Sequence, residues 1–242
     1  MNPERGIASK GIVPALLFAG LFPSLMTWIY FVTFSGNPTM RVLYPAGKLV
    51  QFGFPVVWVA LIQGERVRIG RPSWNGLALG IGFGLAILIA AIGIYFGFFK
   101  GSIWFAEFPA RLREKLGGMG IATPARFGLF AFFISLIHSG LEEYYWRWFF
   151  FGQLRRITRP GAAIPLSAIG FMLHHVIVIA CYFRPEHWPL VAIFSVAVAI
   201  GGCAWAWLYY RTGSIYASWV SHAMVDIALM IIGYDLAWGL AH

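Results

Sequence analysis

The sequence predicts an all-α, polytopic membrane protein of seven transmembrane helices, or eight, with an additional interfacial amphipathic helix. Two observations on composition support this class. Hydrophobic residues make up 60% of the 242 residues and only 11% are charged, whereas a soluble domain carries about 25% charged residues. The apolar residues also gather in long runs separated by short basic clusters. A chain of this length cannot hide so much apolar surface in one soluble core, so lipid is its expected solvent.

Seven apolar runs come close to the length of about 20 residues that a transmembrane helix needs. They are Gly11–Phe34, Lys48–Gln63, Asn75–Phe99, Phe127–Leu154, Ala162–Phe183, Trp188–Tyr210 and Ile215–Leu240. A break in the last run near Gly233 would give eight. In the third run, Gly76, Gly80 and Gly84 recur at four-residue spacing. Small residues at this spacing let two helix backbones approach closely.

The stretch Ser102–Leu116 has a different character, because large apolar residues alternate there with arginine and lysine. This pattern predicts a helix that lies in the membrane interface. An ordinary loop is the alternative, since Pro109 interrupts the pattern. No second domain is indicated, so residues 1–242 are expected to form one transmembrane domain, with residues 127–240 as its catalytic core helices.

The formal net charge of the chain is +9. The basic residues sit in short clusters between apolar runs and form no long basic tract. We interpret them as loop residues that face the headgroups of a lipid bilayer, and we expect no nucleic-acid partner. The only two cysteines, Cys181 and Cys203, lie in apolar runs and give neither a CxxC metal pair nor a disulfide framework.

Ionisable side chains at membrane depth are costly and usually mark function. In this chain they concentrate in three of the last four predicted spans. The residues concerned are His138, Glu142, Glu143 and Arg147 in the first of these spans, His174 and His175 after Phe171 in the second, and His222 and Asp226 in the third.

Helical geometry predicts different roles for Glu142 and Glu143. Glu143 and Arg147 are four residues apart, so they share a helix face and are expected to form a structural ion pair. Glu142 projects about 100° away from Glu143 and lacks that arginine. It is the freer carboxylate, and it shares a face with His138. We expect His138 to support the site or to pack beside it.

The other two spans would bring imidazole rings to the same place. Asp226 lies four residues after His222 and could accept a proton from one ring nitrogen, which would fix the tautomer of His222. His174 projects elsewhere and is expected to be a hydrogen-bonded neighbour. One carboxylate and two or more imidazoles on three helices can activate a water molecule and stabilise an oxyanion. This is peptide hydrolysis without a nucleophilic side chain.

In order and spacing, these motifs resemble those of the CPBP family of intramembrane proteases, also called the Abi or CAAX-protease family, which includes the Ras-converting CAAX endopeptidases. The family pattern is EExxxR, FxxxH and HxxxN on successive core helices. The matching residues are Glu142, Glu143 and Arg147, then Phe171 and His175, then His222 and Asp226. The resemblance covers roughly Phe127 to Leu240.

The resemblance implies a role for each residue. Glu142 would activate the water together with His175, and His222 with the residue four later would help to form the oxyanion site. Glu143 and Arg147 would support this arrangement, and Phe171 would pack beside it. Asp226 stands where the CAAX endopeptidases have Asn. An ionised Asp cannot donate a hydrogen bond to an oxyanion, so Asp226 would have to be protonated or act only on His222.

The expected function is therefore an intramembrane endopeptidase that hydrolyses a membrane-anchored protein or a peptide. We expect it in the inner (plasma) membrane of a bacterium or archaeon, without a cofactor. The sequence does not identify the substrate as prenylated.

Two alternatives remain from the sequence. The first is a zinc protease in which Glu142, His175 and His222 hold the metal, although no HExxH motif is present. The second is a non-catalytic membrane protein, such as a transporter or an immunity or scaffold factor, since a proton-coupled transporter also buries Glu, His and Asp.

Overall fold

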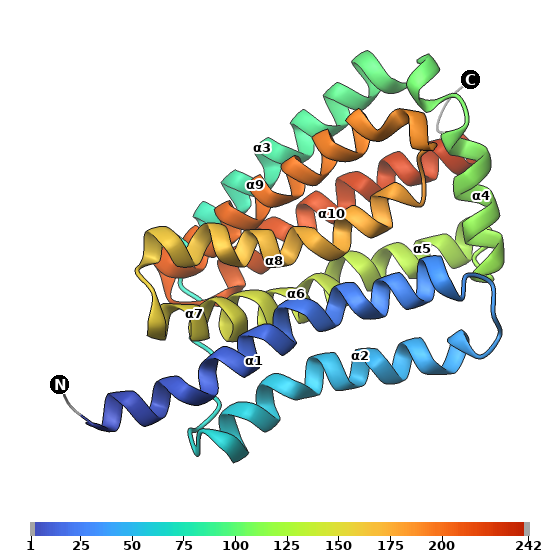
Figure 1. The fold of residues 1–242 in the computed structure, drawn as a ribbon. Coiled ribbons are helices and arrows are strands. Elements are labelled where there is room, and N and C mark those ends of the chain that lie inside the picture. Colours follow the sequence, from blue (N-terminus) through green and yellow to red (C-terminus); the bar gives the residue numbers. More distant parts are fainter. Residues whose placement is uncertain (1–2, 240–242) are drawn as a thin grey trace.

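The computed structural model describes residues 3–239, so residues 1–2 and 240–242 at the ends of the predicted domain lie outside the described residues. The protein is 84% helical, and its described part contains no strand. Figure 1 shows long helices that run side by side and are joined by short connections at the two ends of the bundle. The all-α fold class is thereby confirmed.

Seven helical segments are long and apolar enough to cross a membrane. They are Gly11–Thr33, Val42–Ile62, Trp74–Phe99, Pro124–Ile157, Pro160–Ala180, Pro185–Thr212 and Ile215–Trp238. The last of them passes through Gly233 as one unbroken helix. The count of seven spans is therefore confirmed, and the chain is an integral membrane protein.

The helices that build these spans are numbered in chain order (Figure 1). Their bounds are α1 Pro3–Trp28, α2 Met40–Val57, α3 Trp74–Ile94, α4 Phe108–Gly118, α5 Pro124–Phe132, α6 Ser139–Glu143, α7 Gly152–Ile157, α8 Pro160–Ala180, α9 Trp188–Thr212 and α10 Ile215–Trp238. Several spans contain short π-helical stretches, which are η1 Ile29–Thr33, η2 Trp58–Ile62, η3 Tyr95–Phe99, η5 Phe133–His138 and η6 Tyr144–Phe151. Two 3-10 turns, η4 Ile103–Phe105 and η7 Pro185–His187, lie between spans or at the start of one.

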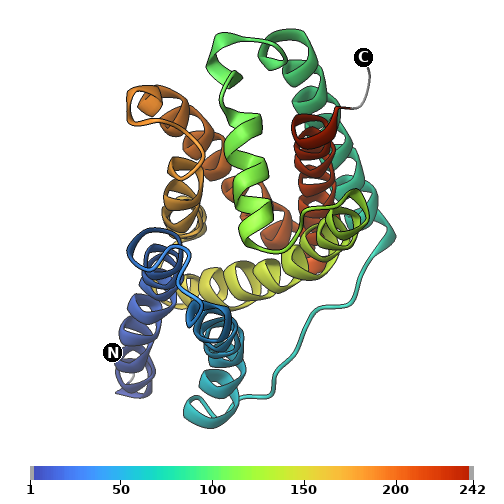
Figure 2. The same ribbon diagram turned by 90° about the vertical axis from the view of Figure 1, so that its right-hand side faces the viewer.

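The segment predicted to lie in the interface folds into η4 and α4. Pro109 is the second residue of α4, where its missing N–H costs no helical hydrogen bond, so it starts the helix and does not break it. Leu112 and Leu116 are buried, while Arg113 and Glu114 are exposed. The helix is thus two-sided, and Figure 2 shows it running across one end of the bundle.

Small residues allow α3 and α10 to pack closely. Gly76, Gly80 and Gly84 are all buried, and a Cβ added at Gly80 would collide with the backbone carbonyl oxygen of Ala217. The four-residue glycine spacing therefore serves helix packing. It holds α10, which carries His222, at a fixed distance from α3.

The fourth span is the one that carries the acidic pair, and its helix is not regular. Two π-helical stretches, η5 and η6, flank the single α-helical turn of α6. π-Helical turns inside α-helices are frequent at functional sites, because each one redirects the side chains that follow. In this span they bracket Ser139–Glu143. Within that turn, Ser139, Glu142 and Glu143 are almost entirely inaccessible to solvent.

Candidate active site

Glu142 lies at the point where three spans meet. It is buried in α6, and imidazole rings from its own span, from α8 and from α10 surround it. The Oε1 atom of Glu142 lies 3.4 Å from Nε2 of His174 and 3.9 Å from Nε2 of His138. Its Oε2 atom lies 3.7 Å from Nε2 of His222. The predicted meeting of one carboxylate with rings from separate helices is therefore present in the geometry.

His174, which we expected to project elsewhere, is the imidazole nearest to Glu142. Its ring is buried, and Nε2 lies within hydrogen-bond distance of the carboxylate. Because an ionised carboxylate only accepts, this contact places the proton of His174 on Nε2. Its Nδ1 atom then has a lone pair, and that atom has no hydrogen-bond partner among the described residues.

His175 is held by the backbone of its own helix. Its Nδ1 lies 2.9 Å from the carbonyl oxygen of Phe171, and since a carbonyl only accepts, Nδ1 is the protonated nitrogen. Nε2 therefore keeps a lone pair that can accept a proton or bind a metal. Glu142, His174 and His175 each offer a ligand atom, and these atoms lie within 4.8 Å of one another.

Glu143, the residue after Glu142, links its own span to α10. Its Oε2 lies 3.2 Å from Nε of Arg147, and both side chains are fully inaccessible to solvent. Its Oε1 lies 2.9 Å from Nδ1 of His222. The ion pair within the helix matches the expected one. The hydrogen bond to His222 was not expected, and it links two spans.

The expectation that Asp226 fixes the tautomer of His222 needs correction. The Oδ1 atom of Asp226 lies 3.8 Å from Nε2 of His222, which is beyond hydrogen-bond distance. Glu143 accepts from Nδ1 instead. Helical spacing identified a residue on the same face of α10, but the closer acceptor belongs to another helix.

Aromatic rings hold the charged groups in place. The ring of His222 stacks on Trp205 with centroids 4.0 Å apart, and that of His174 is parallel to Trp146. The guanidinium of Arg147 lies over Phe171 at 4.7 Å from the ring centroid and over Trp205 at 5.3 Å. Such contacts favour a cation in a desolvated place.

Sequence reasoning missed Trp205, because no pattern separates it from the other tryptophans. A second group comes from α2. The ring of Phe52 meets His138 edge to face at 6.4 Å, and the ammonium of Lys48 lies 5.6 Å from the centroid of the same Phe52 ring. A charged residue inside an apolar run is a usable signal, but the sequence pattern places Lys48 at the beginning of a span.

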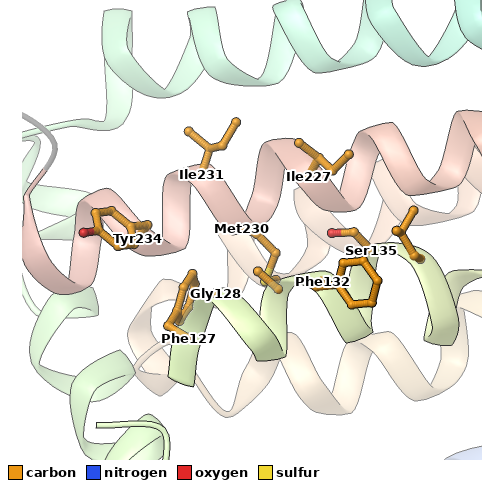
Figure 3. Close-up of a pocket in the computed structure, with 10 residues that line it drawn as sticks. Phe127, Gly128, Phe132, Ser135, Ile227, Met230, Ile231 and Tyr234 are labelled. Atoms are coloured by element: carbon orange, nitrogen blue, oxygen red, sulfur yellow. The ribbon is translucent and has the colours of Figure 1, made fainter. Parts of the chain in front are cut away.

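An apolar groove of about 360 Å³ lies between α5–η5 and α10 (Figure 3). Its lining residues are Phe127, Gly128, Ala131, Phe132, Ser135, Leu136, Ile227, Met230, Ile231 and Tyr234. The groove lies beside the charged and histidine side chains described above, which together form the polar cluster. Ser135 of the groove accepts a hydrogen bond from Ser139 through its carbonyl, and Ile227 follows Asp226.

Comparison with known families bears on this arrangement. Residues 124–228 match the family described as Type II CAAX prenyl endopeptidase Rce1-like. The chain is similar to this family over its core helices. The matched segment is a little under half of the chain, and it contains every residue of the polar cluster except those on α2. No curated protein and no solved structure matches the sequence.

The match to the Rce1-like family model agrees with the resemblance inferred from the three motifs. At the level of the family it supports an intramembrane protease of the CAAX type, which would act on a membrane-associated peptide. The helices α1 to α4 precede the matched segment, so the contacts that α2 makes with the site are features of this chain outside the family match.

Proposed function

We propose that this chain is an intramembrane endopeptidase that uses Glu142 to activate water. The observation that carries the proposal is the burial of Glu142 among three histidine rings, on three separate spans, at 3.4 to 3.9 Å. A structural carboxylate in lipid needs a single partner, such as the arginine that Glu143 has. Glu142 instead faces groups that can accept, donate or position protons.

In the proposed reaction a water molecule lies between Glu142 and Nε2 of His175. Glu142 accepts one proton of the water, and the resulting hydroxide forms a bond to the carbonyl carbon of the scissile peptide. The tetrahedral oxyanion accepts a hydrogen bond from Nε2 of His222, which donates when the ring is protonated at both nitrogens. The carbon–nitrogen bond then breaks, and Glu142 gives its proton to the leaving amine.

Asp226 and Glu143 would act through His222. Glu143 orients the ring by accepting from Nδ1, and Asp226 places a second negative charge 3.8 Å from Nε2. A carboxylate at that distance favours the protonated ring without occupying its donor. We therefore assign Asp226 a positioning role and no direct contact with the oxyanion.

The test is cleavage by purified protein in liposomes. Wild type and Glu142→Gln would each be incubated with a library of membrane-anchored peptides, and the products would be read by mass spectrometry. We expect defined cleavage products with wild type and a rate at least about 100-fold lower with Glu142→Gln, the usual contribution of a general base. Glu65→Gln is the matched control, since Glu65 is an exposed carboxylate that pairs with Arg156.

Two results would overturn the proposal. One is equal cleavage by Glu142→Gln and wild type, which would place the activity elsewhere or in a contaminant. The other is the absence of any cleaved product together with full biological activity of Glu142→Gln in cells. That result would favour a transporter or an immunity or scaffold factor in the plasma membrane of a bacterium or archaeon.

A zinc protease is the second candidate function, and one observation favours it. Glu142, His174 and His175 have ligand atoms within 4.8 Å of one another, and three protein ligands plus water make a catalytic zinc site. This set contains His174 in place of the His222 that the sequence suggested. Activity that survives exhaustive chelation would exclude the zinc site. Stoichiometric zinc by elemental analysis, with activity restored by zinc alone, would establish it.

A further inference from the structure

Lys48 on α2 is a charged side chain beside the site that the hydrolytic reaction leaves unused. It is half-buried, and it lies within the span Val42–Ile62. A cation at this depth is costly and usually has a functional reason. Because α2 lies outside the segment that matches the family, the motifs of that family assign Lys48 no role.

The side chain of Lys48 points into the protein. Its Nζ lies 5.5 Å from the ring centroid of Tyr44 and 5.6 Å from that of Phe52. It donates a hydrogen bond to Oε1 of Gln51 at 3.1 Å. Lys48 is six residues past Val42, or about 9 Å along the helix, and Gln51 lies deeper still. The ammonium therefore does not reach back toward the membrane surface, as a lysine near a helix end usually does.

A series of contacts connects Lys48 with Glu142. Phe52, which contacts the ammonium, meets the ring of His138 at 6.4 Å, and His138 lies 3.9 Å from Glu142. In this series of contacts, the rings of Phe52 and His138 lie between the cation and the group that would activate water.

Lys48 has no carboxylate partner among the side chains that the structure describes. No acidic oxygen of residues 11–239 lies within 4.0 Å of its Nζ, and Gln51 is the one hydrogen-bond acceptor that these residues offer it. An ammonium group has three donors. The other cations beside buried acids are paired, since Arg147 faces Glu143 and Lys100 faces Asp235. An anion that binds at Lys48 would therefore find an available N–H donor. It would also meet a positive charge that no described acid neutralises at contact distance.

We propose that Lys48 binds a carboxylate of the peptide substrate and thereby sets which peptide bond reaches Glu142. This inference rests on the proposed endopeptidase function. An ammonium is a compact point charge, and its hydrogen bonds to a carboxylate are among the stronger ones in proteins. The carboxylate can come from the C-terminus of the peptide or from an Asp or Glu side chain. A lipid phosphate is disfavoured as the ligand, because it lies at the membrane surface and the ammonium of Lys48 points into the protein.

The test measures binding separately from cleavage. Glu142→Gln protein would be placed in nanodiscs of phosphatidylcholine, with a pool of N-palmitoylated, fluorescein-labelled decapeptides of mixed sequence. Three matched pools are used, which carry a free C-terminal carboxylate, a C-terminal amide, or a C-terminal amide with one Asp. Fluorescence anisotropy gives the affinity of each pool for the protein with Lys48, with Lys48→Met and with Lys48→Arg.

We expect the acid-terminated pool to bind at least about tenfold more tightly than the amide pool. Lys48→Met, which keeps the apolar stem between the rings, should remove this difference, and Lys48→Arg should keep most of it. Lys115→Met is the matched control, because Lys115 also lies over a tyrosine ring, that of Tyr182, and pairs with no carboxylate among the residues described. An unchanged unfolding temperature for Lys48→Met would show that the variant is folded.

A preference for the Asp-containing pool that depends on Lys48 would assign the site to a side-chain carboxylate. Equal binding of all three pools, or a preference that Lys48→Met leaves intact, would overturn the proposal. Binding that appears only after anionic lipid is added would also overturn it, in favour of a headgroup. Cleavage of the same pools by wild type is scored separately, so an inactive protein with Lys48-dependent binding would refute the protease and leave the carboxylate site standing.

Discussion

At the scale of single residues, Glu143 connects the polar cluster. It pairs with Arg147 on one side and accepts from His222 on the other. Arg147 is completely buried, and its guanidinium makes no hydrogen bond with the described residues. The pair therefore depends on charge attraction and on the aromatic rings around it. Such an arrangement fixes geometry more than it adds stability.

We predict that Arg147→Met destabilises the protein by about 3–5 kcal/mol, because it leaves Glu143 buried without its counter-charge. Arg156→Met is the matched control. Its ion pair with Glu65 is exposed, and such pairs contribute about 0–1 kcal/mol. Thermal unfolding in detergent, followed by tryptophan fluorescence, gives both values. Equal shifts for the two variants would contradict the prediction.

Asp226 allows a second prediction, because it stands where the CAAX endopeptidases have Asn. Asp226→Asn removes the charge beside His222 but adds a donor that an oxyanion could use. We expect kcat/KM to stay within about tenfold of wild type, while Asp226→Ala, which provides neither group, loses about 100-fold. Steady-state kinetics on one identified peptide measures both. Equal losses for Asn and Ala would contradict the prediction and show that the charge, which both variants lack, matters more than the donor.

The structure brings together the residues that the sequence predicted to meet, but the sequence did not predict all of their contacts. Helical spacing reveals pairs within one helix, such as Glu143 with Arg147, and this pair is present. It cannot reveal the hydrogen bond from His222 to Glu143, whose members are 79 residues apart. It also misplaced His174, because adjacent residues on α8 diverge by about 100° and yet both rings can turn toward one carboxylate.

At the scale of elements, the contact between α3 and α10 positions His222. We predict that Gly80→Ala lowers stability by about 1–3 kcal/mol, because the added methyl group collides with the backbone of Ala217 and not with a movable side chain. Gly82→Ala on the same helix meets nothing within 4 Å and should be neutral or slightly stabilising. Unfolding temperatures of the two variants decide this, and a neutral Gly80→Ala would mean that the helices can separate.

Element boundaries show where sequence patterns are weak. The second span begins near Val42, six residues before the predicted Lys48, because that prediction treated a charge as a boundary. In the last span, Gly233 allows close packing and does not break the helix. A Cβ there would lie 3.3 Å from the ring of Phe127, so the glycine makes room for α5. In both cases a tertiary contact explains a residue that resembles a helix end.

At the scale of the whole molecule, seven spans place successive connections on alternate sides of the membrane. Contacts between loops agree with this alternation. Arg156 in α7 pairs with Glu65, which follows the second span. On the opposite end of the bundle, Arg184 after α8 pairs with Glu107 before α4. Figure 1 shows these two sets of connections at opposite ends of the helices.

Accessibility of single cysteines can test this topology. In a background with Cys181→Ser and Cys203→Ala, we would introduce Asn37→Cys, Arg66→Cys or Thr158→Cys, at the connections after the first, second and fourth spans. An impermeant maleimide applied to sealed vesicles of one orientation should label Arg66→Cys and Thr158→Cys alike and Asn37→Cys oppositely. Detergent-opened vesicles, in which all three react, control for reactivity. If Asn37→Cys and Arg66→Cys label from the same side, the second span does not cross, and Lys48 would lose its place at the depth of Glu142.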